Sequence, residues 1–182
     1  LNENIKIAYT VEEALADADV VLFSAPAQHF RSALTSALGH IKDDALIINV
    51  AKGIEQKTLL RMSQIAADHI DMYRYVVLSG PSHAEEVGRR LPTTVAAASY
   101  NIEAAEKVQD LFMTDRFRVY TTEDVVGVEL GGALKNIIAL GAGISDGMGF
   151  GDNAKAALMT RGLAEITRLG LKLGAKPETF AG

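Results

Sequence analysis

Short, continuous apolar runs that alternate with segments of helical length constrain this chain most. The runs are Val20–Phe23, Ala45–Val50 and Tyr75–Leu78, and amphipathic segments at 28–41 and 58–70 separate them. Apolar runs without polar alternation are typical of strands buried on both faces, as in parallel sheets. Strands that alternate with helices form βαβ units, so the sequence predicts an α/β fold built on a doubly wound parallel sheet.

The rest of the chain divides into a sheet-forming part and a helical part. We expect a strand at 5–10, a short helix at 11–17, and strands at 93–98 and 117–120 with a helix at 102–113 between them. After about Val125 the strand signals stop and two long helical patterns follow, one at 125–144 and one from Asp152 or Asn153 to Gly174. We therefore expect a sheet domain over residues 1–126 and the start of an all-helical domain over residues 127–182.

Composition excludes several classes of protein. The 182 residues include 23 acidic and 18 basic side chains, a net charge of −5, which argues against a broad nucleic-acid surface. The absence of Cys excludes disulfides, thiolate metal sites and a Cys nucleophile, and it fits a cytoplasmic protein. No uninterrupted apolar run reaches the roughly 18 residues of a membrane span, so no membrane insertion is expected. The four His residues lack paired metal spacing, so no metal is expected either.

Three expected strands end in loops that could share one crevice. These loops are Ser24-Ala25-Pro26, Ala51-Lys52-Gly53 and Ser79-Gly80-Pro81-Ser82. In open α/β sheets ligands bind beyond the carboxyl ends of the strands. Lys52, where a buried strand emerges, would give this crevice a positive charge for an anionic substrate. The alternative is that these are turn residues only.

Ser82 and Glu85 have the spacing of a capping box for the next helix. Either this pair only caps the helix, or the helix N-terminus also offers its free N–H groups to an anion. The sequence leaves both interpretations open.

The helical segment at 125–144 has an unusual second face. At 100° per residue its large apolar residues share one face, and the opposite face carries Gly132, Lys135, Asn136, Ala139 and Gly143. A solvated face would carry several charges, so this one should meet either a ligand or a tightly packed neighbour. If Lys135 is partly buried there, desolvation would lower its pKa toward the range of a general acid/base.

These residues resemble the bacterial-type NAD(P)-dependent sn-glycerol-3-phosphate dehydrogenase family. The resemblance depends on three blocks and on their order and spacing, and it covers essentially the whole chain. The blocks are Asn49-Val50-Ala51-Lys52-Gly53-Ile54-Glu55, Leu78-Ser79-Gly80-Pro81-Ser82-His83-Ala84-Glu85-Glu86, and Glu129-Leu130-Gly131-Gly132-Ala133-Leu134-Lys135-Asn136 with its sequel through Gly151-Asp152-Asn153.

The resemblance implies the C-terminal part of a Rossmann-type sheet followed by the start of a helical substrate domain. It also implies interconversion of dihydroxyacetone phosphate and sn-glycerol 3-phosphate with NAD or NADP, for phospholipid synthesis, by a homodimer. Lys135 matches the catalytic lysine, which would protonate the carbonyl oxygen. Lys52, Gly80, Ser82, Lys135 and Asn136 match substrate-binding positions, while Lys52 and Ala84 match cofactor-binding positions.

Two departures from the family pattern matter. The loop after Phe23 reads Ser24-Ala25-Pro26-Ala27, where the family has a Val-Pro-Ser/Thr form, so Ala27 cannot supply a hydroxyl. The glycine fingerprint and the substrate-phosphate residues would lie outside this chain. We therefore expect a piece of a longer protein that is inactive alone, with the choice between NAD and NADP unreadable.

Two other functions remain as alternatives at this point. One is a two-domain dehydrogenase of the 3-hydroxyisobutyrate or 6-phosphogluconate type, which also pairs a Lys with an Asn on a helix after the sheet. The other is a non-catalytic nucleotide-binding or oligomerisation module, in which Lys135 and its neighbours would serve packing alone.

Overall fold

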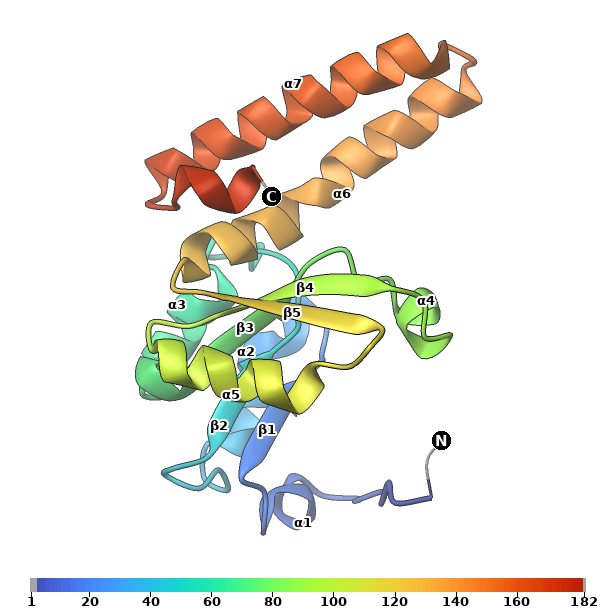
Figure 1. The fold of residues 1–182 in the computed structure, drawn as a ribbon. Helices are drawn as coiled ribbons and strands as arrows, with labels where there is room; N and C mark the ends of the chain where they lie inside the picture. The colour runs from blue at the N-terminus through green and yellow to red at the C-terminus, as the bar shows by residue number, and fades with distance from the viewer. Residues whose placement is uncertain (1–2, 182) are drawn as a thin grey trace.

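A five-stranded sheet with helices on both faces forms the body of the protein, and a helical hairpin rises from it (Figure 1). The computed structural model describes residues 3–181. The strands lie side by side in chain order, β1 to β5: Val20–Phe23, Leu46–Asn49, Tyr75–Ser79, Thr93–Ala98 and Phe117–Thr122. The α/β class expected from the apolar runs is confirmed.

The helices and 3₁₀ turns connect these strands and continue beyond them. Their bounds are α1 Val11–Leu15, α2 Ala27–Ala37, α3 Met62–Ala67, η1 Met72–Arg74, α4 Ala84–Gly88, α5 Ile102–Phe112, α6 Val125–Gly147, α7 Gly151–Lys172 and η2 Pro177–Phe180. The expected helix at 58–70 is much shorter than predicted, because Leu59 has a left-handed φ of 60° within a loop that closes on itself.

The sheet is parallel except at one step. Strands β1, β2 and β3 pair in parallel, β4 runs antiparallel to β3, and β5 is again parallel to β4. The connection from β3 to β4 holds only the five-residue α4, so the chain turns back instead of crossing over the sheet. Consequently, β1 to β3 end at one edge of the sheet and β4 and β5 end at the other.

The strand expected at 5–10 is absent, and this prediction was wrong. No strand among residues 3–181 pairs with this segment, and its apolar side chains Ile5, Ile7 and Tyr9 are exposed, Tyr9 by 92%. A strand needs a neighbouring strand to accept and donate its backbone hydrogen bonds. Apolar alternation alone therefore misled the prediction.

Two apolar clusters hold the sheet, one on each face. One lies under α2, α3 and the start of α6, and it includes Phe23 and Phe30, whose rings meet edge-on at 5.5 Å. The other lies under α5 and includes Ile48 and Val108. Because both faces of the central strands are covered, the strand ends are fixed in space and can position side chains beyond them.

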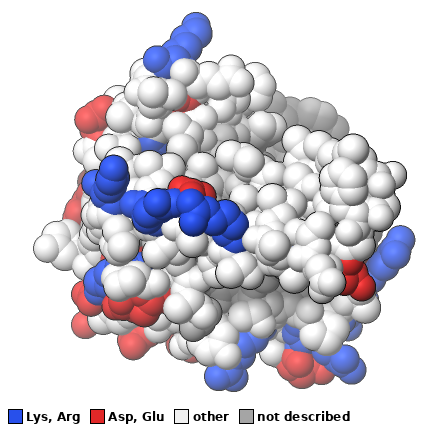
Figure 2. All heavy atoms as spheres, turned by 90° about the horizontal axis from the view of Figure 1, so that it is seen from above, with Lys and Arg blue, Asp and Glu red and all other residues white. Residues whose placement is uncertain are grey.

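The hairpin of α6 and α7 extends above the sheet (Figure 1). A Cβ on Gly162 would lie 2.3 Å from the Cδ1 atom of Ile138, so the two helices approach closely there and a larger residue would force Ile138 to move. The large residues Ile137 and Ile144, 65% and 54% exposed, point away from this contact. Seen from above, where the hairpin lies, broad areas carry no Lys, Arg, Asp or Glu (Figure 2).

By length and composition alone, α6 also meets the criterion for a membrane-spanning helix, a criterion that core helices of soluble proteins pass as well.

Asp124 connects the beginning of α6 to the segment around η2. This carboxylate caps the helix by accepting from the N–H of Gly127 at 2.9 Å, and it accepts from the N–H of Lys176 and the hydroxyl of Thr179 at 2.8 and 2.5 Å.

Candidate active site

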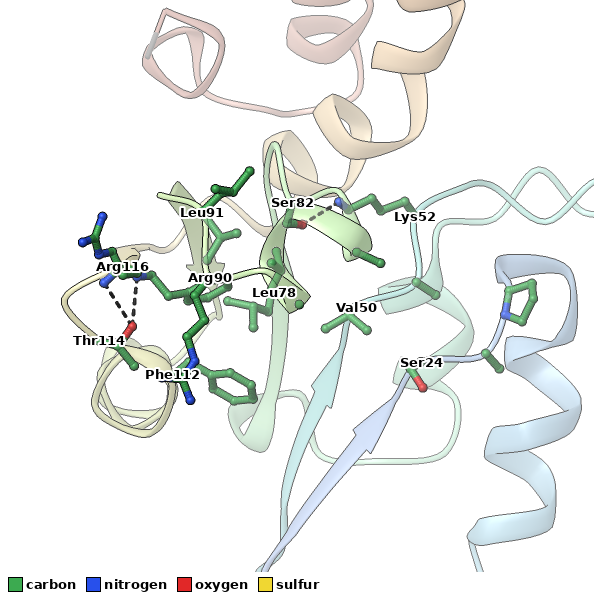
Figure 3. A pocket seen from close by; sticks show the side chains of 18 of the residues that line it. Ser24, Val50, Lys52, Leu78, Ser82, Arg90, Leu91, Phe112, Thr114 and Arg116 are labelled. Atoms are coloured by element: carbon green, nitrogen blue, oxygen red, sulfur yellow. Dashed lines mark hydrogen bonds between the residues drawn. The ribbon is translucent and has the colours of Figure 1, made fainter. Parts of the chain in front are cut away.

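The loops after β1, β2 and β3 meet at one edge of the sheet, as their parallel arrangement requires. They line a cavity of about 1080 Å³ together with α4 and the loop before β5. In Figure 3, Lys52 reaches toward Ser82 at one side of the cavity, Val50 and Leu78 come from the strand ends, and Arg116 lies on the side of β5. The crevice expected from the sequence is therefore present.

Lys52 connects two of these loops. Its ammonium donates to the carbonyl oxygen of Gly80 at 2.8 Å and to the hydroxyl of Ser82 at 2.9 Å. Partial burial lowers the pKa of Lys52, and the nearby charge of Lys135 lowers it further. A cation that is half removed from water beside a second cation attracts an anion strongly.

Ser82 does not cap a helix, so that interpretation of its spacing was wrong. Helix α4 begins after His83, which makes no side-chain cap, and the hydroxyl of Ser82 accepts from Lys52 instead. The preceding Pro81 and the turn bond from the N–H of Ser82 to the oxygen of Gly80 direct this hydroxyl toward the cavity. Ala84, at the start of α4, lines the same cavity.

Helix α6 brings the second lysine to this edge. A Cβ on Gly132 would lie 2.5 Å from the Oγ atom of Ser79 and 3.6 Å from the Cγ atom of Lys52. The helix therefore passes close to Ser79 and Lys52, so part of the small-residue face predicted for this segment packs against the sheet. One turn further on, Lys135 lines a second cavity of about 460 Å³ with Gly80 and Gly131.

The expected burial of Lys135 is not observed, and neither is a single apolar face on α6. Lys135 and Asn136 are both exposed in residues 3–181, and Asn136 is not among the residues that line the two cavities. Only the first part of α6 lies on the sheet, so Leu130 is buried while Ile137 and Ile144 face outward. The lysine that is partly removed from water is Lys52, and not Lys135 as the sequence analysis predicted.

The loop that carries Lys52 is fixed by residues that the sequence analysis missed. Glu55 accepts from the Nε and Nη2 atoms of Arg31, each at 2.8 Å, and Gln28 donates to the carbonyl oxygen of Ile54 at 2.8 Å. A Cβ on Gly53, whose φ is +150°, would lie 2.7 Å from the Cβ atom of Ala27. Helix α2 thus holds the loop on one side.

We expect the Arg31–Glu55 pair to contribute stability that depends on pH. The hydrogen bond from Arg31, followed by that from Thr58, lowers the pKa of Glu55 to about 2 from 4.5. The pair's contribution is therefore complete above pH 4.5 and is lost as the pH falls from 4.5 toward 2. Urea unfolding at pH 2.5 and pH 6 should show a smaller acid loss in Glu55→Gln than in the wild type. The exposed Glu106→Gln is the control, and an equal acid loss in Glu55→Gln and the wild type would contradict the assignment.

A buried carboxylate was also missed. Glu129, on the first part of α6, accepts from the N–H and hydroxyl of Ser63 at 2.7 and 2.6 Å and from the Nη1 atom of Arg61 at 2.6 Å. The one available signal was a single acid between Val128 and Leu130 in an apolar helix, because such an acid needs a buried partner.

No metal site is formed by the residues the structure describes. Among residues 3–181 no three His, Asp or Glu side chains come together as ligands. Asp146, which flanks the Gly-rich turn after α6, pairs with Lys155 at 2.8 Å instead of standing free for a cation. The chemistry of this edge is that of two ammonium groups and of backbone and hydroxyl oxygens.

The larger cavity has the lining and the position of a site that could hold part of a dinucleotide. Its walls at Val50 and Leu78 are apolar, as a flat ring requires, and Lys52 and Ser82 supply polar groups at one side. It lies beyond the carboxyl ends of parallel strands, where such cofactors bind in this class of sheet.

Family models and related sequences all point to the same family of dehydrogenases. Family models for the NAD-dependent glycerol-3-phosphate dehydrogenase N-terminus and C-terminus match residues 1–105 and 124–182. Glycerol-3-phosphate dehydrogenases [NAD(P)+] from Pelotomaculum thermopropionicum and Bacillus subtilis are 60% and 56% identical over 100% of this chain, which covers 53% and 54% of them. The chain thus spans about half the length of the curated relatives it matches.

Solved structures agree with this. A crystal structure of glycerol-3-phosphate dehydrogenase from Coxiella burnetii superposes with a TM-score of 0.91 at 36% identity, and the match covers 100% of this chain and 56% of that one. The structure of DsGPDH of Dunaliella salina gives a TM-score of 0.88 at 30% identity, and the match covers 100% of this chain and 32% of that one.

Proposed function

Since the chain belongs to the NAD-dependent glycerol-3-phosphate dehydrogenase family, we propose that its full-length protein interconverts dihydroxyacetone phosphate and sn-glycerol 3-phosphate with NAD or NADP. The observation that carries the proposal is the meeting of two lysines from different parts of the chain, Lys52 and Lys135, at the ends of the parallel strands. The product is a phosphorylated glycerol of the kind that phospholipid synthesis consumes.

We propose the following division of roles among the side chains. When bound, NAD(P)H supplies the hydride that adds to the ketone carbon. The ammonium of Lys135 donates a proton to the carbonyl oxygen as the alkoxide charge develops, and its amine accepts the proton in the reverse direction. Asn136, next to it, would orient the substrate. Lys135 is exposed in this half of the protein, so the remainder of the full-length chain would have to exclude water around it.

The strand-end loops would bind rather than react. Lys52 would attract the phosphorylated substrate and contact the cofactor, while Gly80 and Ser82 hold its ammonium in place. Ala84 would contact the cofactor, since it lines the larger cavity and carries no side chain that could fill it.

We also propose that residues 1–126 and 127–182 belong to a cofactor domain and a substrate domain. This is supported by the start of α6 at Val125 and by the range of the second family model, which begins at 124. A cytoplasmic homodimer is proposed on the family resemblance, and light scattering of the full-length protein tests the dimer.

A substrate comparison tests the proposed function. The full-length protein should oxidise NADH or NADPH with dihydroxyacetone phosphate at a rate at least 100-fold above that with methylmalonate semialdehyde, the aldehyde formed by oxidation of 3-hydroxyisobutyrate. It should not oxidise 6-phosphogluconate. Turnover of only a hydroxyacid or of 6-phosphogluconate would overturn the proposal.

We expect substrate binding to weaken as the pH rises, and to do so at a lower pH than it would if Lys52 had the pKa of an ordinary lysine. The pKa of Lys52 is lowered from 10.5, so its ammonium, the form that attracts the phosphate, is lost before that pH is reached. The KM for dihydroxyacetone phosphate should therefore rise before the pH reaches 10.5. Lys52→Arg keeps its charge at that pH and should flatten the rise, and an identical rise in Lys52→Arg would exclude Lys52 as the cause.

A further inference from the structure

Glu129 joins the two parts of the protein that each carry a lysine of the site. It lies on α6 six residues before Lys135, and its partners Arg61 and Ser63 lie at the start of α3, just after the loop that carries Lys52. The carboxylate side chain is only 3% exposed. We propose that Glu129 is a positioning residue, an inference that rests on the proposed function. It fixes the position of α6 along its axis and its rotation, so that Lys135 lies beside Lys52.

The connection from Glu129 to Lys52 is short and continuous. Arg61, whose Nη1 atom contacts Glu129 at 2.6 Å, forms an antiparallel bridge with Ile54, two residues after Lys52. On the other side, Gly132 is one helical turn after Glu129 and is the residue at which α6 touches Ser79. A shift of α6 at Glu129 therefore changes the distance between the two lysines.

Stability alone does not account for this buried carboxylate. Burial raises the pKa of Glu129, against the opposing effects of the Ser63 hydrogen bonds and the Arg61 charge. Replacing a buried ion pair with apolar residues of similar size is often neutral or stabilising, so such a pair is weak evidence for a stabilising role. Its three directed hydrogen bonds, however, specify one arrangement of α6 on α3, which apolar packing would leave free to slide.

Glu129→Gln in the full-length protein is the first test. The amide keeps the volume but turns an NH₂ group toward Arg61 and Ser63, which are donors themselves. We expect kcat to fall at least 10-fold while the KM for cofactor and substrate changes less than 3-fold. Ser63→Ala, which removes one donor and retains the backbone N–H, should give a smaller fall in kcat, and the double variant should be no worse than Glu129→Gln alone.

A matched control separates positioning from loss of stability. Val108→Ala truncates a fully buried side chain on α5, on the other face of the sheet, and should lower Tm without lowering kcat. If Glu129→Gln retains a kcat within 2-fold of Val108→Ala, the positioning role is excluded.

A second measurement needs no turnover. NMR titration of ¹³C-methylated lysines reports the pKa of Lys52, which the charge of Lys135 lowers. We expect this pKa to rise in Glu129→Gln, because Lys135 is no longer held close. If the wild type turns over none of the tested substrates, the proposed function is wrong and the titration alone decides the positioning role. An unchanged pKa of Lys52 in Glu129→Gln would then overturn it.

Discussion

Lys135→Ala is expected to lower the kcat of the full-length protein by about 10²–10⁴-fold, because acid–base catalysis by one positioned group typically contributes that much. Lys135 is exposed and makes none of the hydrogen bonds or ion pairs found in residues 3–181, so its removal should leave Tm unchanged. Stopped-flow reduction of dihydroxyacetone phosphate, with circular dichroism of the same samples, measures both quantities.

The control is Lys172→Ala, which removes another exposed lysine near the end of α7, away from the strand-end loops. Its kcat should equal that of the wild type. If Lys135→Ala retains the full rate, the catalytic role is wrong and the small-residue face of α6 serves packing only, as in the non-catalytic alternative.

Gly80→Ala, which adds one methyl group to the site, is expected to lower both stability and cofactor affinity. A Cβ there would lie 2.8 Å from both the carbonyl oxygen of Thr94 and the Cα atom of Val95, which are backbone atoms and cannot move aside. Overpacking of this kind costs about 1–3 kcal/mol. It would also displace the carbonyl oxygen that accepts from Lys52, so cofactor affinity should fall together with stability.

Urea unfolding and fluorescence titration with NADH or NADPH measure these two losses. The matched control is Gly39→Ala, just after α2 and outside both cavities, where an added Cβ meets nothing within 4 Å. That variant should be neutral or stabilised by up to about 1 kcal/mol, since alanine reduces the conformational freedom of the unfolded chain. Equal stability and affinity of the two variants would contradict the packing described for Gly80.

Continuous apolar runs in the sequence predicted the strands well where both faces of a strand are buried, because burial requires apolar residues at every position. The continuous apolar runs correspond to β1, β2 and β3, and the run at Thr93–Ala98 matches β4 at both ends. The same reasoning failed at 5–10, because alternation of apolar residues says nothing about whether a partner strand is present. It also could not foresee that β4 turns back, which depends on how little helix the β3–β4 connection holds.

The site was predictable where a residue's position follows from the end of a strand. Lys52, Gly80 and Ser82 come together because parallel strands end at one edge. Arg31, Glu55, Arg61 and Glu129 were missed because each acts through a partner 24 or more residues away, which no local spacing reveals. The exposure of Lys135 likewise depends on how far α6 extends beyond the sheet.

The antiparallel step between β3 and β4 has a consequence for how this protein tolerates insertions. Because β5 ends at the opposite edge of the sheet from the strand-end loops, α6 must travel from its cap at Asp124 to the level of Ser79 before Lys135 can face the cavity. The ten residues from Val125 to Lys135 therefore set this length, about 15 Å along the helix axis. One residue added or deleted within that length would turn the lysine by about 100° around the axis, so that Lys135 would no longer face the cavity.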